Sequence, residues 1–109
     1  MEKVIKKVVY SSDFYKDLKA IYTYGHETFG ETMANLFQEE ILHVTRGLSY
    51  KFLLYSECKY LETKTQLYRN IILGKYLIIY RIKSEKIEVL RALHGSQNPK
   101  IIKAIKKIK

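Results

Sequence analysis

Three of the four arginines in this chain, Arg69, Arg81 and Arg91, lie in one stretch that is rich in β-forming residues. The chain otherwise carries its positive charge on lysine, whereas arginine offers a planar set of donors that suits phosphate or carboxylate groups. These arginines are therefore candidates for contacting a charged target or for stabilising charge in catalysis. The structural alternative is that Arg81 pairs with Glu88 and that Arg91 caps a sheet edge.

His94 is the candidate general acid or base, because it ends a β-forming run and histidine titrates near neutral pH. The alternative is that it only hydrogen-bonds into the loop that begins at Gly95. The other histidines have no partners at metal-ligand spacing, and the single cysteine, Cys58, excludes a disulfide scaffold or a cysteine-based zinc site. The sequence has no glycine-rich phosphate loop and no Ser-His-Asp signature. We expect no metal and no cofactor.

Tyrosines and lysines supply further candidates for contact with a nucleic acid or another target. Tyrosine can stack on bases or act as an acid in phosphoryl chemistry, and Tyr68, Tyr76 and Tyr80 lie among the arginines. The alternative places them at the edge of the core with their hydroxyl groups in water. The basic tail either contacts nucleic acid or an acidic surface, or is a core-packing helix with a solvated lysine face. Its candidate residues are Lys100, Lys103, Lys106 and Lys107.

The elements that position these side chains begin with a strand over residues 3–10 and a helical hairpin. Ser11-Ser12-Asp13 supplies acceptors for the start of the first helix, Gly30 is a natural break after it, and Gly47 is the expected cap of a second helix over 31–46. Residues 49–66 fit neither period and are interpreted as a partly buried connection. The expected apolar stripes are Phe14, Leu18, Ile21, Gly25 and Phe29 on the first helix, and Met33, Leu36, Phe37, Ile41, Val44 and Leu48 on the second.

From Leu67 onward the pattern becomes β, with runs over 67–73, 76–82 and 87–94. A two-residue turn at Gly74-Lys75 predicts that Leu73 lies opposite Tyr76, that Arg69 lies opposite Tyr80, and, after the next turn, that Arg81 lies opposite Glu88. Both faces of this sheet are apolar, so we expect the hairpin to cover one face and a helix over 99–109, or a partner protein, to cover part of the other. Strict alternation puts Ile78, Tyr80, Val89, Arg91 and Leu93 on one face, and Ile79, Leu90, Ala92 and His94 on the other. The apolar face of the last helix consists of Ile101, Ile102, Ile105 and Ile108.

The length of 109 residues fits one domain over 1–109, and 47% hydrophobic residues are enough to form a core. The net charge of +9 favours phosphate-rich or acidic partners. Residues 11–48 hold three basic and six acidic side chains, whereas residues 49–109 hold fourteen basic and four acidic ones, so a polyanion should bind the second half. No stretch has the length of a signal peptide core or a membrane span, and we expect a cytoplasmic protein with no membrane partner.

The segment YLIIYRI, a short turn and then IEVLRALHG, over residues 76–95, resembles the C-terminal signature of the RelE/ParE toxin superfamily. Ser12-Asp13-Phe14 leading to Asp17-Leu18 resembles the first helix of that family, and Tyr68-Arg69 falls where members often have an aromatic or basic residue. The resemblance implies an α+β fold: an N-terminal strand, an antiparallel helical hairpin, a three-stranded antiparallel meander and a C-terminal helix. It also implies a toxin of a type II toxin–antitoxin module, held inactive by a cognate antitoxin protein. The implied antitoxin-binding residues, on the first strand and an exposed stripe of the hairpin, are Ile5, Val9, Phe14, Leu18 and Ile21.

Two activities occur in the superfamily that the chain resembles. RelE-like members cut mRNA in the translating ribosome, whereas ParE-like members poison DNA gyrase. Nuclease members commonly carry arginine where this chain has Leu77, and a leucine cannot stabilise developing phosphate charge. The His94-Gly95 ending looks more like ParE-type members. The resemblance therefore favours a gyrase inhibitor; the alternatives are a ribosome-dependent endoribonuclease that uses Arg69, Arg81, Arg91 and His94 on mRNA, and a degenerate toxin kept as an antitoxin-binding partner.

Overall fold

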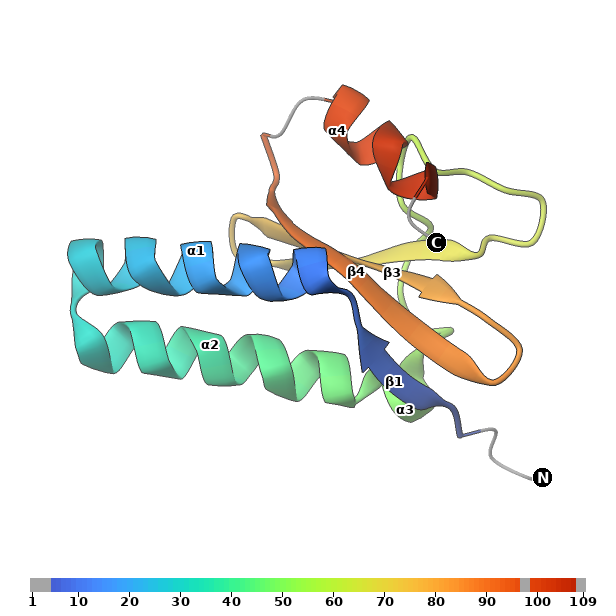
Figure 1. Ribbon diagram of the computed structural model, residues 1–109. Helices are drawn as coiled ribbons and strands as arrows, with labels where there is room; N and C mark the ends of the chain where they lie inside the picture. Colours follow the sequence, from blue (N-terminus) through green and yellow to red (C-terminus); the bar gives the residue numbers. More distant parts are fainter. Residues whose placement is uncertain (1–4, 97–98, 108–109) are drawn as a thin grey trace.

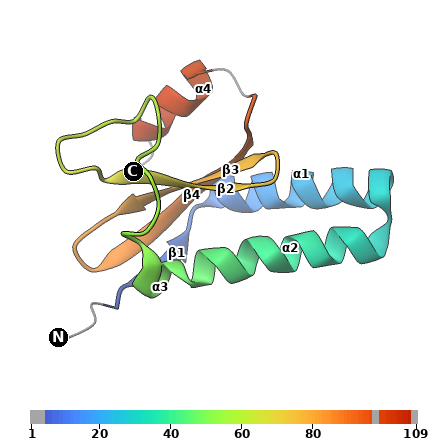
Figure 2. The same ribbon diagram turned by 180° about the vertical axis from the view of Figure 1, so that it is seen from behind.

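A computed structural model describes residues 5–96 and 99–107 as a four-stranded sheet with helices on both of its faces (Figures 1 and 2). The strand order is β1-β4-β3-β2; β1 runs parallel to β4, and the other neighbours are antiparallel. The expected α+β fold is confirmed. In chain order the elements are β1 (Lys7–Tyr10), α1 (Ser12–Phe29), α2 (Glu31–Arg46), α3 (Leu48–Lys51), β2 (Tyr68–Leu73), β3 (Tyr76–Ile82), β4 (Lys86–His94), α4 (Pro99–Lys103) and the 3-10 helix η1 (Ala104–Lys107).

The start of α1 is fixed by the residue that precedes it. The Ser11 hydroxyl accepts a hydrogen bond from the backbone N–H of Phe14 at 3.0 Å, which satisfies a free donor of the first turn. The same hydroxyl donates to the carbonyl oxygen of Leu90 at 2.6 Å, so the cap also joins the helix to β4. At the other end, Gly30 has a φ of 93°, a conformation that favours glycine, and separates α1 from α2. The expected cap at the start of the first helix and the expected break at Gly30 are both confirmed.

The apolar stripes expected on the hairpin are correct only near the sheet. Phe29, expected to be buried, is 67% exposed, and Met33 and Leu36 are exposed as well. Figures 1 and 2 show that the far half of the hairpin projects beyond the sheet, so its apolar residues have no strand to pack against. The residues that α1 and α2 bury are Phe14, Leu18, Ile21, Ala34, Ile41 and Thr45.

The register of the meander agrees with the prediction up to a β-bulge in β4. Arg69 lies opposite Tyr80 and Arg81 opposite Glu88, but the pairing shifts between Ile79 and Tyr80 and leaves Leu90 without a partner. Because one extra residue moves every following side chain to the other face, the predicted faces are wrong beyond this point. Ala92, which lies opposite Ile78, joins the cluster under the hairpin, and Leu93 joins the other cluster.

Both faces of the sheet are covered by the chain itself. The hairpin packs Phe14 and Ile41 against Ile78, Tyr80 and other strand residues. On the second face, Ile102 of α4 and Ile105 of η1 join Ile79, Leu90 and Leu93 in a second buried cluster. The core-packing interpretation of the tail is therefore confirmed, although Ile101 is 38% exposed and Ile108 lies outside the described residues.

The connection between the hairpin and β2 is partly buried, as expected. Gly47 is the C-cap of α2, as expected, and because its φ of −63° is right-handed the short helix α3 follows it directly. Cys58 and Leu61 are then buried, and the backbone N–H of Cys58 donates to the carbonyl oxygen of Tyr68 at 2.8 Å. The bonds to β2 mean that this segment covers part of the outer edge of the sheet.

Candidate functional site

Arg69 holds the connecting segment against β2. Its Nη1 donates to the carbonyl oxygens of Leu53 at 3.0 Å and Tyr55 at 3.1 Å, and its Nε donates to the carbonyl oxygen of Gln66 at 3.1 Å. The guanidinium therefore satisfies backbone acceptors of a loop that has few strand partners of its own. The structure gives this predicted target-contacting residue an internal role.

Arg81 is buried in an ion pair, as the structural alternative for this residue predicted. Its Nε lies 2.7 Å from Oε1 of Glu88, and its Nη1 donates to the Tyr68 hydroxyl at 3.3 Å. Burial acts to raise the pKa of Glu88, but the hydrogen bond and charge of Arg81, with Lys83 and Lys86 nearby, outweigh it and lower that pKa. Arg81 is only 8% exposed, so it is not presented to a target.

Arg91 joins β4 to α1. It donates from Nε to Oδ2 of Asp17 at 2.7 Å and from Nη2 to Oδ1 at 3.0 Å. The same Oδ2 accepts from the backbone N–H of Ala92 at 2.9 Å, directly after the bulge. The hydrogen bonds to Asp17 raise the pKa of Arg91. The side chain therefore fixes the hairpin to the sheet rather than capping a sheet edge.

The three candidate tyrosines have different environments. Tyr80 is fully buried and donates to the carbonyl oxygen of Phe52 at 2.6 Å, and Tyr68 is 7% exposed beneath Arg81. Neither can stack on a base, because neither ring reaches the surface. Tyr76 is half-buried; burial, with a contribution from Tyr24, raises its pKa.

His94 is exposed at the end of β4 and is positioned by its neighbours. Its Nδ1 lies 2.7 Å from the hydroxyl oxygen of Ser96, and its ring meets the Tyr76 ring edge-on with centroids 5.7 Å apart. These contacts agree with the loop-bonding alternative that the sequence left open. His94 takes no part in the hydrogen bonds described above for Arg69, Arg81 and Arg91. The partners of those three arginines are Leu53, Tyr55, Gln66, Glu88, Tyr68 and Asp17.

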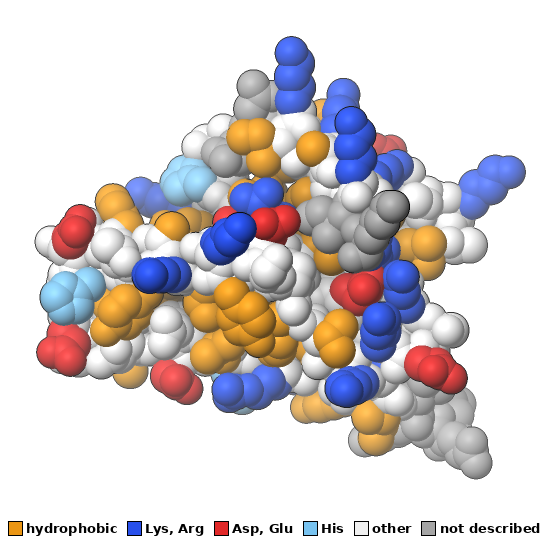
Figure 3. Space-filling view, viewed as in Figure 1, with side chains coloured by type: hydrophobic (Ala, Val, Ile, Leu, Met, Phe, Trp, Pro, Cys, Tyr) orange, Lys and Arg blue, Asp and Glu red, His pale blue; other side chains and the backbone are white. Residues whose placement is uncertain are grey.

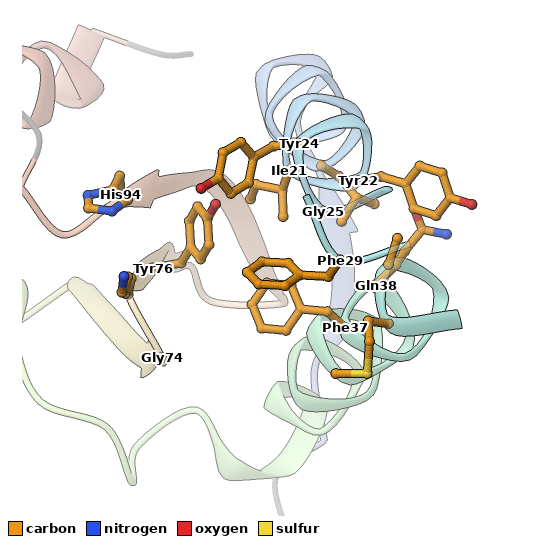
Figure 4. A pocket seen from close by; sticks show the side chains of 14 residues that line it. Ile21, Tyr22, Tyr24, Gly25, Phe29, Phe37, Gln38, Gly74, Tyr76 and His94 are labelled. Carbon is orange, nitrogen blue, oxygen red and sulfur yellow. The ribbon is translucent and has the colours of Figure 1, made fainter. Parts of the chain in front are cut away.

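An apolar groove of about 620 Å³ lies between the projecting half of the hairpin and the β2–β3 turn (Figure 4). Tyr24 of α1, Phe29 and Met33 line it from the helices and are 58%, 67% and 56% exposed. Figure 4 shows the Tyr76 ring standing toward Tyr24 from the sheet end. Lys75 and His94 also line this end of the groove. The groove is therefore an open apolar surface with a lysine and a histidine at its sheet end.

The part of the chain that the structure describes contains no group of three or more His, Cys, Asp or Glu side chains arranged to hold a metal ion. Nor is any helix of residues 5–96 and 99–107 long and apolar enough to cross a bilayer. The site described so far is therefore made of ion pairs, aromatic rings and an open apolar groove.

Comparison with known families connects these features to a class of protein. The family model described as "ParE toxin of type II toxin-antitoxin system, parDE" matches residues 8–99. The chain belongs to the ParE toxin family. This confirms the resemblance to the RelE/ParE toxin superfamily and shows that the chain is a type II toxin. No curated protein gave a significant sequence match.

Two solved structures show the fold of this ParE-family toxin in other proteins. A chain in the chromosomal ParDE TA system from P. aeruginosa is similar with a TM-score of 0.69 and 18% identity, over 83% of this chain and 96% of that one. A chain in the E. coli DinJ-YafQ toxin-antitoxin complex is similar with a TM-score of 0.50 and 15% identity, over 85% of this chain and 96% of that one. At these identities the likeness shows a shared fold.

The structure corrects part of the expected antitoxin-binding stripe of the toxin. Phe14, Leu18 and Ile21 are 0%, 9% and 8% exposed, because this side of α1 packs on the toxin's own sheet. Ile5 is 72% exposed, and Val9 is half-buried in the edge strand β1, so these two remain open to a partner.

The groove itself was not predicted, because each helix was expected to bury one continuous apolar face. A signal was present: Tyr22, Tyr24, Phe29, Met33 and Leu36 crowd around the Gly30 turn, more apolar side chains than one stripe holds. The far half of the hairpin projects beyond the sheet, so the apolar residues around the Gly30 turn have no strand to pack against. The excess apolar residues of the toxin therefore form an exposed surface.

Proposed function

We propose that this toxin inhibits DNA gyrase and is neutralised by a cognate antitoxin protein. The match of the ParE family model over residues 8–99 carries the proposal, because the ParE-like members that the sequence resembles act in this way. The alternative activity, ribosome-dependent cleavage of mRNA, needs basic side chains that are placed around the reacting phosphate.

The interactions of the arginines support gyrase inhibition over mRNA cleavage. Arg69 binds loop carbonyl groups, Arg81 pairs with Glu88, and Arg91 pairs with Asp17. To stabilise the negative charge of a phosphorane-like transition state, these guanidinium groups would have to leave their present partners, which lie 2.7–3.1 Å away. Leu77 supplies no charge at the position where nuclease members commonly have arginine.

For the antitoxin, the groove beside the hairpin is the best-supported docking site. Its exposed aromatic and aliphatic side chains fit the apolar face of an amphipathic helix, and Lys75 with His94 favours an acidic residue at the sheet end. One structural neighbour described above comes from a ParDE TA system and the other from a toxin–antitoxin complex, which supports a partner of this kind. The proposed second contact consists of Ile5, which precedes the edge strand β1, and Val9, which lies in it.

A plasmid cleavage assay tests the gyrase proposal. We expect the purified toxin to make gyrase accumulate linear plasmid after detergent and protease treatment, and we expect prior addition of the antitoxin from the neighbouring reading frame to prevent this. Primer extension on a defined mRNA in a cell-free translation system should show intact message. Translation-dependent cuts in the mRNA without linear plasmid would replace the proposal with the nuclease alternative. The absence of both effects would favour the degenerate toxin.

Substitution in the groove tests the antitoxin site. Phe29→Ser removes a 67% exposed ring from the groove, whereas the matched control Leu54→Ser changes a 75% exposed side chain outside it. Burying such a side chain against a partner stabilises a complex by about 1.5–3 kcal/mol, so Phe29→Ser should weaken antitoxin binding by roughly 10- to 150-fold. Gyrase inhibition and thermal stability should stay unchanged in both variants. Equal antitoxin affinity for both variants would place the antitoxin elsewhere.

A further inference from the structure

The tail that closes the second face of the sheet presents a row of lysines to solvent. Ile102 and Ile105 are 4% and 1% exposed and hold the segment on the sheet, which turns its polar side outward. Figure 3 shows Lys and Arg side chains gathered over the part of the surface where Figure 1 places α4 and η1. The exposed lysines of this tail are Lys100, Lys103, Lys106 and Lys107.

The loop that precedes β2 extends this row and is fixed to it. The Nζ atoms of Lys59 and Lys103 lie 5.3 and 5.6 Å from the centre of the Tyr60 ring, so the ring joins loop and tail by two cation–π contacts. Lys106 donates to the carbonyl oxygen of Glu62 at 3.2 Å. We call the resulting surface the basic ridge; it consists of Lys59, Lys64, Lys100, Lys103, Lys106 and Lys107.

Little negative charge offsets the basic ridge. Residues 57–67 and 99–107 together hold six lysines and two acidic residues, Glu57 and Glu62. Of these, Glu57 accepts from the backbone N–H of Thr63 at 3.0 Å and is occupied within the loop. The helical hairpin, in contrast, has more acidic than basic side chains. The ridge segments therefore carry a net charge of +4, on the sheet face opposite the hairpin.

We propose that the basic ridge binds the phosphate backbone of duplex DNA, so that the toxin contacts the DNA segment held by gyrase as well as the enzyme. The setting rests on the proposed gyrase inhibition, but DNA binding by the ridge does not. Lys100 and Lys103 lie about 4.5 Å apart along the axis of α4, and Lys106 and Lys107 follow on η1, whereas each strand of duplex DNA carries one charge per about 3.4 Å. Lysine ammonium groups on a rigid support match phosphates without reading sequence.

Salt-dependent anisotropy with a labelled DNA duplex tests the proposal. The ridge variant carries Lys100→Ala, Lys103→Ala and Lys107→Ala; the control variant removes the same charge from exposed lysines elsewhere, with Lys16→Ala, Lys19→Ala and Lys51→Ala. Each lost phosphate contact reduces the slope of log affinity against log salt by about 0.9, so the ridge variant should lose about 2.7. Between about 50 and 200 mM salt its affinity should then change about 40-fold less than that of the wild type. The control variant and a Lys-to-Arg triple variant of the ridge should keep the wild-type slope.

Several outcomes would overturn the proposal. Equal losses in the ridge and control variants would mean that DNA binding follows net charge, and tighter binding of a matched RNA would make RNA the partner. In the gyrase assay, the ridge variant should trap less linear plasmid while binding antitoxin normally; full trapping would deny the ridge its role there. If the wild type binds DNA through the ridge but leaves gyrase active, the ridge stands and gyrase inhibition fails.

Discussion

Replacement of Asp17 by alanine should uncouple the hairpin from the sheet. The carboxylate accepts two hydrogen bonds from Arg91, at 2.7 and 3.0 Å, and one from the backbone N–H of Ala92 at 2.9 Å. All three donors lose their acceptor in Asp17→Ala. The side chains of Asp17 and Arg91 are 14% and 24% exposed, so water can replace only part of this set.

The size of the effect follows from the burial of the pair. Removing one partner of a buried ion pair costs about 3–5 kcal/mol, because the other charge is left without compensation. The partial exposure of Arg91 places Asp17→Ala near the lower limit, at about 3 kcal/mol. In Arg91→Ala the bond from Ala92 to Asp17 remains, so we expect about 2 kcal/mol. The double variant loses the pair only once, at about 3.5 kcal/mol, which gives a coupling energy of about 1.5 kcal/mol.

Urea unfolding of the four proteins measures this coupling, and growth inhibition in cells reports toxicity. We expect the loss of toxicity in Arg91→Ala to follow its loss of stability and to be matched by Asp17→Ala. Strictly additive effects on the free energy of unfolding would refute the coupling. An Arg91→Ala variant of full stability that is no longer toxic would show that the guanidinium contacts the target.

Three further perturbations probe other parts of the fold. The pKa of Glu88 is lowered below its ordinary 4.5, so its ionised form stabilises the fold above that pH, and this contribution is lost as the pH falls through the lowered pKa. Glu88→Gln should therefore flatten the acid side of a plot of unfolding free energy against pH. An unchanged plot would contradict the ion pair. Gly30 has a φ of 93°, so Gly30→Ala should cost about 1–3 kcal/mol in urea unfolding, whereas Gly47→Ala, in right-handed backbone, should gain about 0.5–1 kcal/mol; the reverse order would refute the assigned conformations. Burial, aided by Glu57, raises the pKa of the Cys58 thiol to about 11, so iodoacetamide at mildly alkaline pH should label it only after denaturation, and rapid labelling of the native protein would contradict its burial.

Much of the fold could be predicted because local signals agree with the final packing. The glycine of the Gly74-Lys75 turn takes a φ of 60°, and the two-residue turn sets the pairing of β2 with β3 directly. Ser11 caps α1 through the hydroxyl that the sequence suggested. In each case the deciding interaction lies within a few residues of the signal, so sequence spacing was sufficient.

The candidate site could not be predicted, because its deciding contacts join distant segments. The partner of Arg91 is Asp17, 74 positions away, and nothing in the spacing of charges distinguishes this pair from a target-contacting arginine. The bulge at Leu90 has no glycine or proline to mark it and reverses the faces of Ala92 and Leu93. Phe29 is exposed because the end of the hairpin projects beyond the sheet, and helix periodicity carries no information about that direction.

The position of β4 has a consequence for how the toxin is made. This strand is the last to be synthesised, yet it lies inside the sheet between β1 and β3. The pairing of β1 with β4 begins with Lys7 opposite Lys86. The ribosome must therefore translate past residue 86 before this pairing can form. A ribosome that stops before β4 releases a hairpin of helices and a pair of strands with nothing to join them. Production of the folded toxin is therefore all-or-none: a message interrupted before β4 yields fragments without the folded sheet, and toxicity requires translation through β4.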